Sequence, residues 1–232
     1  MIADKILFLD IETVPRWPDY DAMPEHFRVL WNHKANHIKN LPDDTARSLY
    51  PRAGIYAEFG KIICISTGFF HQDCFRIKSF YGDDEKIMLE DFKTMLERMN
   101  STQPYLLAAH NGKEFDFPYI SRRMLVNGIM LPDVFDNSGK KPWETSFIDT
   151  MEMWKFGDYK HYTSLALLAA LFDIPSPKED IDGSQVAIVY YESNDLKRIV
   201  RYCQKDVITV ARLYCKFKGL PAPADDQIVI IE

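Results

Sequence analysis

Short apolar runs along the chain predict the strands of one sheet. Residues 5–12 form an almost unbroken apolar run, which is typical of a buried strand. The runs at 61–71 and 74–81 are rich in aromatic and β-branched residues and also predict strands. Two shorter strands are expected at about 105–109 and 146–149.

Other segments repeat their apolar residues at helical spacing. The clearest of these helices spans about 195–216. Its single apolar stripe is formed by Leu196, Ile199, Val200, Cys203, Val207, Val210, Ala211 and Tyr214. Further helices are expected at about 83–99, before residue 127, near 163–172 and near 183–192.

Residues 15–59 interrupt this regular pattern as a long insert. Structureless loops of that length are uncommon in compact domains and are often functional. Within the insert, residues 26–40 contain no acid, three Lys or Arg and three of the six histidines, and they predict an amphipathic helix. The tail at 219–232 ends in aliphatic residues, so it is either an edge strand or a contact for a partner.

Length and composition are consistent with one α/β domain. A chain of 232 residues with 47% hydrophobic residues can bury a full core. No apolar stretch reaches the length of a membrane span, and the N-terminus does not resemble a signal peptide. The four cysteines lack paired metal-ligand spacing, so we expect reduced thiols in a cytoplasmic protein. The net charge of −6 argues against tight, sequence-independent binding of duplexes but does not exclude a nuclease.

Two acids stand at the end of the first predicted strand. Because side chains alternate across a strand, Asp10 and Glu12 should project from the same face. Neighbouring carboxylates repel each other unless a proton or a cation lies between them, and their oxygens suit Mg²⁺ or Mn²⁺. The alternative is a solvated pair at a strand end, because Asp-x-Glu is a common pattern.

A third acid follows the strand at 105–109. In the segment His110-Asn111-Gly112-Lys113-Glu114-Phe115-Asp116, the Asn-Gly pair favours a turn, and Asp116 should lie near the start of a helix. Taken alone, this carboxylate is better explained by the helix dipole than by a metal site.

A fourth acid lies on the helix at 195–216. Tyr202 and Asp206 are four residues apart, so they share one face at the edge of the apolar stripe. Asp206 should therefore be partly buried, where an unpaired carboxylate is costly. A metal ion would satisfy it, and so would an Arg or a Lys.

Together, these residues resemble the DEDD superfamily of 3′–5′ exonucleases, in its tyrosine subclass. The three segments are similar to that family's Asp-x-Glu, Asn-x-x-x-Phe-Asp and Tyr-x-x-x-Asp motifs, in the expected order. The resemblance spans about residues 5–217 and is closest to the exonuclease domain of family B DNA polymerases, in a stand-alone form. It implies a ribonuclease-H-like α/β fold, a mixed β-sheet flanked by helices, with residues 1–232 as one exonuclease domain.

The resemblance also implies a two-metal hydrolysis of phosphodiester bonds with Mg²⁺ or Mn²⁺, releasing nucleoside 5′-monophosphates. It assigns Asp10 to both metals, Glu12 and Asp206 to the metal that activates water, and Asp116 to the second metal through a water molecule. Tyr202 would orient the attacking water, because an ordinary tyrosine pKa near 10 makes a poor base at neutral pH.

Five residues are candidate substrate contacts: Asn111, Lys113, His110, Trp31 and Lys34. Bases of single strands stack on aromatic rings while their phosphates meet cations, so the helix at 26–40 is expected to cover the site and hold the strand. The alternative puts Trp31 in a core. His110 is equally well explained as a satisfied histidine at a strand end, and Asp149 fits a helix cap better than a helper carboxylate.

The expected substrate is single-stranded DNA with a free 3′ end. An exoribonuclease is the first alternative, because the same residues cleave either backbone and the 2′-OH contacts that discriminate cannot be located. A catalytically weak nucleic-acid-binding module is the second. The sequence indicates no membrane association and no particular protein partner.

Overall fold

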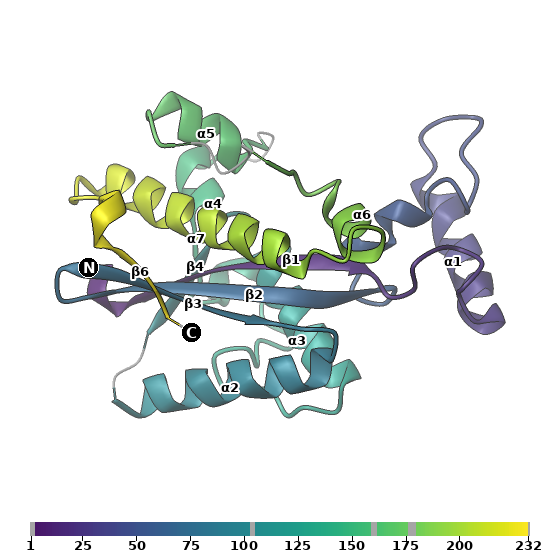
Figure 1. Ribbon diagram of the computed structural model, residues 1–232, viewed down its shortest axis with the longest axis horizontal. Helices are drawn as coiled ribbons and strands as arrows, with labels where there is room; N and C mark the ends of the chain where they lie inside the picture. The colour runs from purple at the N-terminus through teal and green to yellow at the C-terminus, as the bar shows by residue number, and fades with distance from the viewer. Residues whose placement is uncertain (1–2, 103–104, 159–161, 176–179, 232) are drawn as a thin grey trace.

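The computed structural model describes residues 3–102, 105–158, 162–175 and 180–231 (Figure 1). Its strands are β1 (Ile6–Pro15), β2 (Gly60–His71), β3 (Cys74–Tyr81), β4 (Leu106–Ala109), β5 (Ile148–Asp149) and β6 (Ile228–Ile231). They form a six-stranded sheet in the order β5-β4-β1-β2-β3-β6. Because β1 is antiparallel to β2 and parallel to β4, the sheet is mixed, as expected.

Helices cover both faces of this sheet. They are α1 (Glu25–Ile38), α2 (Glu85–Thr102), α3 (Asp116–Val126), α4 (Thr150–Lys155), α5 (Leu165–Leu171), α6 (Val186–Tyr191) and α7 (Leu196–Lys218). The long helix α7 lies across one face, together with α4, α5 and α6, whereas α2 and α3 lie on the other (Figure 1). The fold is therefore the α/β architecture that the sequence predicts.

Strand β1 separates two apolar cores by simple alternation. Leu7, Leu9 and Ile11 pack in the core beneath α2 and α3. Ile6 and Phe8 point the other way, into the core under α7. The next alternate residues of β1 after Ile6 and Phe8 therefore also face α7.

Helix α7 realises the stripe that the sequence predicts. Val207, Val210 and Tyr214 enter the core with β1 and β3. The Asp195 side chain caps the first turn by accepting from the backbone N–H of Arg198, and the helix ends at Gly219 with a φ of 64°. A left-handed residue at this position favours glycine and stops the helix cleanly.

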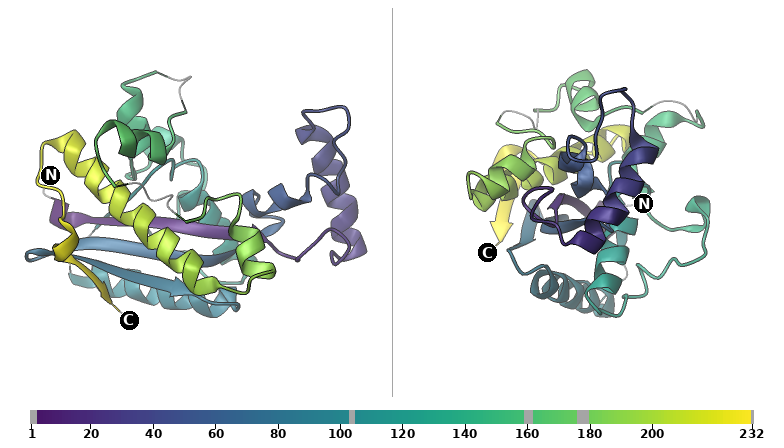
Figure 2. Two further views of the ribbon diagram at one scale, coloured as in Figure 1. Left: turned by 45° about the horizontal axis from the view of Figure 1, so that its top comes forward. Right: turned by 90° about the vertical axis from the view of Figure 1, so that its right-hand side faces the viewer.

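The insert folds as a small lobe with a core of its own. Helix α1 and a 3₁₀ helix at Tyr50–Ile55 enclose a cluster made of Met23, Trp31, Ala35, Leu49, Tyr50, Ala53 and Phe59. The lobe projects beyond the end of the sheet (Figure 2). The predicted amphipathic helix is thus present, but it packs on its own lobe.

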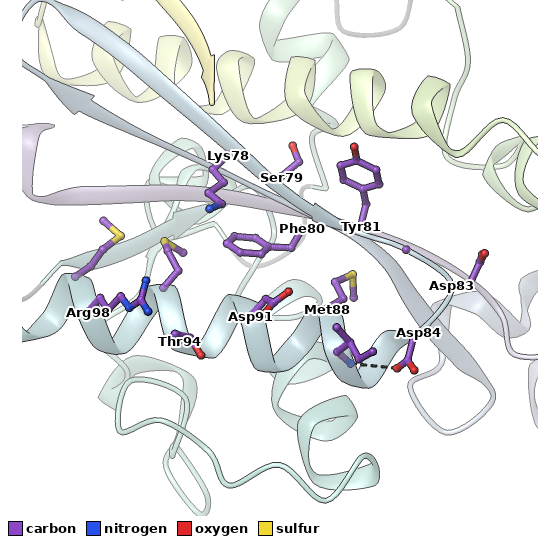
Figure 3. Close-up of a pocket in the computed structure, with 14 residues that line it drawn as sticks. Lys78, Ser79, Phe80, Tyr81, Asp83, Asp84, Met88, Asp91, Thr94 and Arg98 are labelled. Carbon is purple, nitrogen blue, oxygen red and sulfur yellow. Dashed lines mark hydrogen bonds between the residues drawn. The ribbon is translucent and has the colours of Figure 1, made fainter. Parts of the chain in front are cut away.

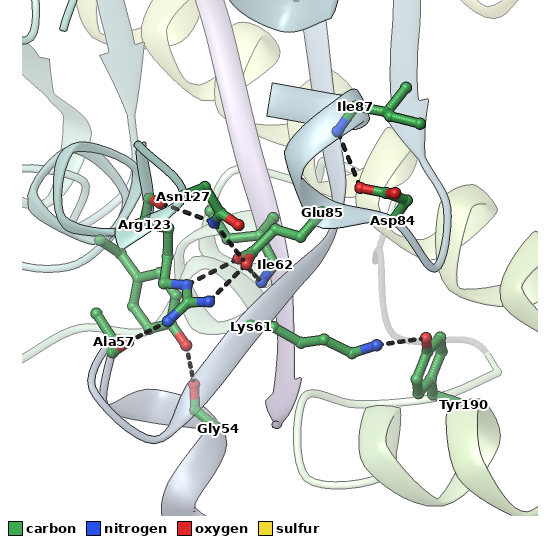
Figure 4. A network of polar contacts seen from close by, with 11 residues as sticks. Gly54, Ala57, Lys61, Ile62, Asp84, Glu85, Ile87, Arg123, Asn127 and Tyr190 are labelled. Atoms are coloured by element: carbon green, nitrogen blue, oxygen red, sulfur yellow. Dashed lines mark hydrogen bonds and ion pairs between the residues drawn. The ribbon is translucent and has the colours of Figure 1, made fainter. Parts of the chain in front are cut away.

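A buried polar network anchors the base of this lobe (Figure 4). Glu85 at the start of α2 accepts from the Arg123 guanidinium of α3 and, at 2.7 Å, from the backbone N–H of Ile62. The same guanidinium donates to the carbonyl oxygen of Ala57 at 2.9 Å. Glu85 and Arg123 are both buried, so each needs the other to remain charged there.

The C-terminal tail resolves as an edge strand. β6 pairs in parallel with β3 from Phe75 to Lys78, which decides between the two expectations for this segment. None of the helices in the described residues combines the length and the apolar character that crossing a membrane would require.

Candidate active site

The acids of the first motif lie on the face of β1 that α7 covers. Asp10 and Glu12 follow Ile6 and Phe8 in the strand's alternation, and β2 places Cys64 opposite Glu12. The pairing of β1 with β2 shifts between Glu12 and Thr13. A bulge of this kind commonly re-aims side chains beside functional sites.

Asp116 reaches the same position from the start of α3. β4 accompanies β1 only as far as Phe8. Beyond that point the backbone N–H of Ile11 donates to Oδ1 of Asp116 at 3.2 Å. The Asp116 carboxylate is buried. Asp116 is the first residue of α3, and its side chain binds β1 at Ile11, the residue between Asp10 and Glu12.

Burial and mutual repulsion perturb these carboxyl groups strongly. Burial, and then Asp206, Glu12 and Asp116, raise the pKa of Asp10 well above its usual value. Burial and Asp206 also raise the pKa of Glu12 well above its usual value. Burial and neighbouring acids raise the pKa of Asp116 to about 7. The four acids of the three motifs therefore meet in one electrostatically coupled cluster.

A divalent cation fits this cluster. Oδ2 of Asp10 is buried and accepts no hydrogen bond from the residues that the structure describes, which is costly for a polar atom unless a bound cation or water satisfies it. The donors are mainly carboxylate oxygens, which suit hard cations such as Mg²⁺ and Mn²⁺. The sequence-predicted metal ligands are thus brought together.

Cys203, which the sequence pattern places only in the apolar stripe of α7, also lies in this cluster. One ligand atom each from Asp10, Glu12 and Cys203 lie within 4.8 Å of one another. The Cys203 thiol donates to the carbonyl oxygen of Asp10 at 3.4 Å, and burial raises its pKa well above the usual range. The thiol therefore stays protonated and supports the strand that carries Asp10.

Tyr202 lines the cluster from α7, one turn before Asp206. Its hydroxyl makes a hydrogen bond with the Asp206 carboxylate. Burial, followed by Asp206, Glu12 and Asp10, raises the pKa of this phenol far above its usual value. The hydroxyl is therefore a neutral hydrogen-bond donor in the metal-free protein.

Asp149 organises the loop that precedes Asp116. As predicted, it caps α4, with its Oδ1 accepting from the backbone N–H of Met151 at 2.9 Å. The same side chain also accepts from the backbone N–H groups of Asn111 at 2.9 Å and Lys113 at 3.1 Å. The sequence showed the cap but not this second contact, because Asn111 is far away along the chain.

Three candidate substrate contacts lie in that loop. Both ring nitrogens of His110 are engaged, with Thr150 Oγ1 and the carbonyl oxygen of Thr163, each at 2.9 Å. His110 is therefore a hydrogen-bonded histidine at a strand end, which was the alternative to a substrate contact. Lys113 Nζ donates to Glu152 at 2.7 Å. Asn111 adopts a φ of 60° and its Oδ1 accepts from the hydroxyl of Tyr162 at 3.1 Å.

The two candidates in the insert lie in the separate lobe. Trp31 is 0% exposed, and its indole N–H donates to the carbonyl oxygen of Ala46 at 2.7 Å. It therefore has no free face for a base, which corrects the expectation that it stacks on substrate. Lys34 is partly exposed and its ammonium lies 4.3 Å from the ring centre of Tyr56.

A large cavity lies elsewhere in the molecule. It has a volume of about 710 Å³ and lies between β3 and α2, with Lys78 and Arg98 at one end and Asp83 and Asp84 at the other (Figure 3). None of the acids of the three motifs lines it. This cavity is therefore separate from the candidate active site.

A mixed sheet flanked by helices, with a buried acidic cluster at its central strand, defines a ribonuclease-H-like domain with a candidate metal centre. The chain belongs to the family described as "Predicted 3'-5' exonuclease related to the exonuclease domain of PolB", whose model matches residues 55–227. The matched region contains Asp116, Tyr202 and Asp206, whereas Asp10 and Glu12 precede it.

A solved structure supports the fold. The chain is similar to the family B DNA polymerase from the hyperthermophilic archaeon Pyrobaculum calidifontis, with 14% sequence identity and a TM-score of 0.54. The similarity covers 91% of this chain and 24% of the polymerase chain. The chain thus spans about a quarter of the length of that polymerase, and the likeness concerns the fold alone.

Proposed function

We propose that this chain is a metal-dependent 3′–5′ exonuclease that hydrolyses single-stranded DNA from its 3′ end and releases nucleoside 5′-monophosphates. The supporting observation is the convergence of the acids of three distant motifs, Asp10 and Glu12, Asp116, and Asp206. Membership of a family described as 3′–5′ exonucleases points in the same direction.

The four carboxylates are the proposed ligands of two divalent cations, Mg²⁺ or Mn²⁺. Burial and crowding make the cluster a place where charge compensation is needed, as the raised pKa of Asp10 indicates. When bound, such cations neutralise the charge of the phosphate and activate water for an in-line attack.

Tyr202 is the proposed positioning group for the attacking water. Its phenol stays neutral and is held by Asp206. A neutral hydroxyl at this place can hydrogen-bond a water molecule and fix its direction, but it does not remove the proton. Tyr202 therefore contributes orientation, which is worth less than the charge of the metal ligands.

The loop of the second motif is the proposed contact for the terminal nucleotide. The Asn111 side chain lies at its surface, and Asp149 fixes its backbone. We assign His110 and Lys113 to positioning that loop, because their side chains already bind Thr150 and Glu152 of α4. Lys34 remains a proposed phosphate contact in the insert lobe, since its ammonium is partly exposed.

A reducing, cytoplasmic setting is the proposed environment of the enzyme. All four cysteines are free, and three of them are buried. Free buried thiols are the usual state of cysteines in reducing compartments.

Product analysis tests this function. The protein is incubated with a DNA oligonucleotide and Mn²⁺, and the small products are separated by chromatography. The proposal predicts nucleoside 5′-monophosphates that appear from the start of the reaction and are absent with EDTA. Short oligonucleotides as the first products, or nucleoside 3′-monophosphates, would contradict it.

A further inference from the structure

Two adjoining cavities form a groove along the β5 edge of the sheet. One, of about 390 Å³, lies between α3 and the segment 131–147. The other, of about 430 Å³, lies between β5, α4 and the end of α7. Lys113 and Phe147 line both cavities, so the two adjoin at these side chains. We call this feature the edge groove.

The edge groove is cationic although the chain carries a net charge of −6. Its lining includes Lys113, Arg122, Lys140 and Lys218. Its two acids are already engaged: Asp149 by backbone N–H groups and Glu152 by Lys113. Within the described part of the chain, no carboxylate pairs with Arg122, Lys140 or Lys218. Three positive charges are therefore left for an anionic ligand.

Aromatic rings accompany these cations. Phe147 stacks on Phe117 with ring centres 4.0 Å apart, and both rings line the first cavity. In the segment that borders the first cavity, Trp143 is 74% exposed, and the Lys141 ammonium lies 5.3 Å from the centre of its ring. Cations that alternate with exposed aromatic rings are the usual surface for a single strand, whose bases stack while its phosphates are neutralised.

The edge groove begins beside the acidic cluster. Lys113 is three residues before Asp116, and its backbone N–H donates to Asp149. That carboxylate also holds Asn111 and raises the pKa of Asp116. A strand whose last nucleotide meets the second-motif loop therefore finds the groove next to it.

We propose that the edge groove binds the unpaired DNA strand on the 5′ side of the bond to be cleaved. Arg122, Lys140 and Lys218 contact its phosphates, and Trp143 stacks on a base. This inference rests on the proposed exonuclease function, which it deepens by naming the path of the substrate.

A binding experiment tests the groove without requiring catalysis. Fluorescein-labelled dT20 is titrated with protein in EDTA, and its anisotropy is followed at several salt concentrations. The Arg122→Ala/Lys140→Ala protein should bind about tenfold more weakly. Its slope of log Kd against log salt should fall by about 1.4, because each lost phosphate contact with a single strand is worth about 0.7. Trp143→Ala should weaken binding about fivefold or more.

Lys86→Ala/Lys93→Ala is the matched control, because it removes two cations of α2 that line neither cavity of the edge groove. It should change neither the affinity nor the salt slope. Wild-type affinity and slope in Arg122→Ala/Lys140→Ala, or no binding of dT20 by the wild type, would overturn the groove.

Hydrolysis of the p-nitrophenyl ester of thymidine 5′-monophosphate separates this inference from the proposed function. The ester is too short to reach the groove, so Arg122→Ala/Lys140→Ala should cleave it at the wild-type rate. An equal loss of ester hydrolysis in this variant would contradict a role confined to strand binding. If the wild type cleaves neither the ester nor DNA, the proposed exonuclease function is wrong. The anisotropy measurement still tests whether the edge groove binds a single strand.

Discussion

At the scale of single residues, the protein keeps acids where burial and repulsion oppose their charge. The pKa of Asp10 and that of Glu12 are both raised well above their usual values. Such a cluster destabilises the folded chain when no cation is bound, and natural proteins commonly accept this cost at sites of function.

The raised pKa of Asp116 makes the stability of the metal-free protein depend on pH. Because its pKa is raised to about 7, the folded protein holds a proton that the unfolded chain has lost above about pH 4. The stability of the metal-free protein therefore falls as the pH rises from about 4 to beyond 7. Asp116→Asn should raise the melting temperature in EDTA at pH 8 and change it little at pH 4.

Thermal unfolding at the two pH values measures this effect. Asp91→Asn on the exposed side of α2 is the control, since it removes an acid outside the cluster. Mn²⁺ should stabilise the wild type more at pH 8 than at pH 5, because protons compete with the metal. A metal-free Asp116→Asn protein that is less stable than the wild type at pH 8 would contradict this account.

Tyr202 and Asp10 should differ in the size of their effects. Tyr202→Phe removes one hydroxyl that orients water, so we expect a reduced but measurable kcat. Asp10→Ala removes the central acid of the cluster, so we expect no detectable cleavage. The measurement is single-turnover cleavage of labelled DNA, and equal loss in both variants would show that the tyrosine does more than position water.

At the scale of secondary-structure elements, the site depends on how the ends of β4, β5 and α3 are joined. Asp149 connects them, because it caps α4 and holds the backbone of Asn111 and Lys113. The loop that ends at Asp116 thus takes its shape from a side chain on another strand.

Asp149→Ala should therefore impair both stability and catalysis. Loss of the cap alone costs about 1 kcal/mol, and the released loop should lower kcat further. Asp84→Ala is the matched control, since Asp84 accepts from the backbone N–H of Ile87 at 3.1 Å in the first turn of α2. It should lose similar stability but keep the wild-type kcat. Equal kcat values in the two variants would show that Asp149 only caps α4 and does not shape the loop for catalysis.

The sequence predicted these elements to different degrees. The strands at 61–71 and 74–81 and helix α7 were recovered almost to their ends, because their hydrophobic periodicity extends over many residues. Asp10, Asp116 and Asp206 were predicted to act together because their three motifs occur in the order that the resemblance requires, and the structure brings these acids into one cluster. A core for Trp31 was one of two alternatives, but a separate core within the insert was not predicted, because its members are scattered through the insert without a period. The contacts of Asp149 and Cys203 depend on tertiary neighbours.

At the scale of the whole molecule, the Glu85–Arg123 pair joins segments that are far apart in sequence (Figure 4). It connects α2 to α3, to the start of β2 and to the base of the insert lobe. Because α3 also carries Asp116, this network helps to hold the second motif against β1.

Arg123→Met should be strongly destabilising, by about 3–5 kcal/mol, because it leaves Glu85 buried without its partner. Glu85→Gln in the same chain should recover part of this loss, since no buried charge then remains. Denaturant unfolding measures both proteins. A loss that is the same with and without Glu85→Gln would mean that packing, rather than the buried charge, sets the cost.

The central claim is that the acidic cluster cleaves nucleic acid from the 3′ end. The most direct test uses 5′-labelled single-stranded DNA and the matching RNA with Mg²⁺ or Mn²⁺, and compares the wild type with Asp10→Ala on a denaturing gel. We predict a ladder that shortens from the 3′ end, is faster for DNA, and disappears with EDTA and in Asp10→Ala. Full activity of Asp10→Ala, or no cleavage of either polymer by the wild type, would contradict this account.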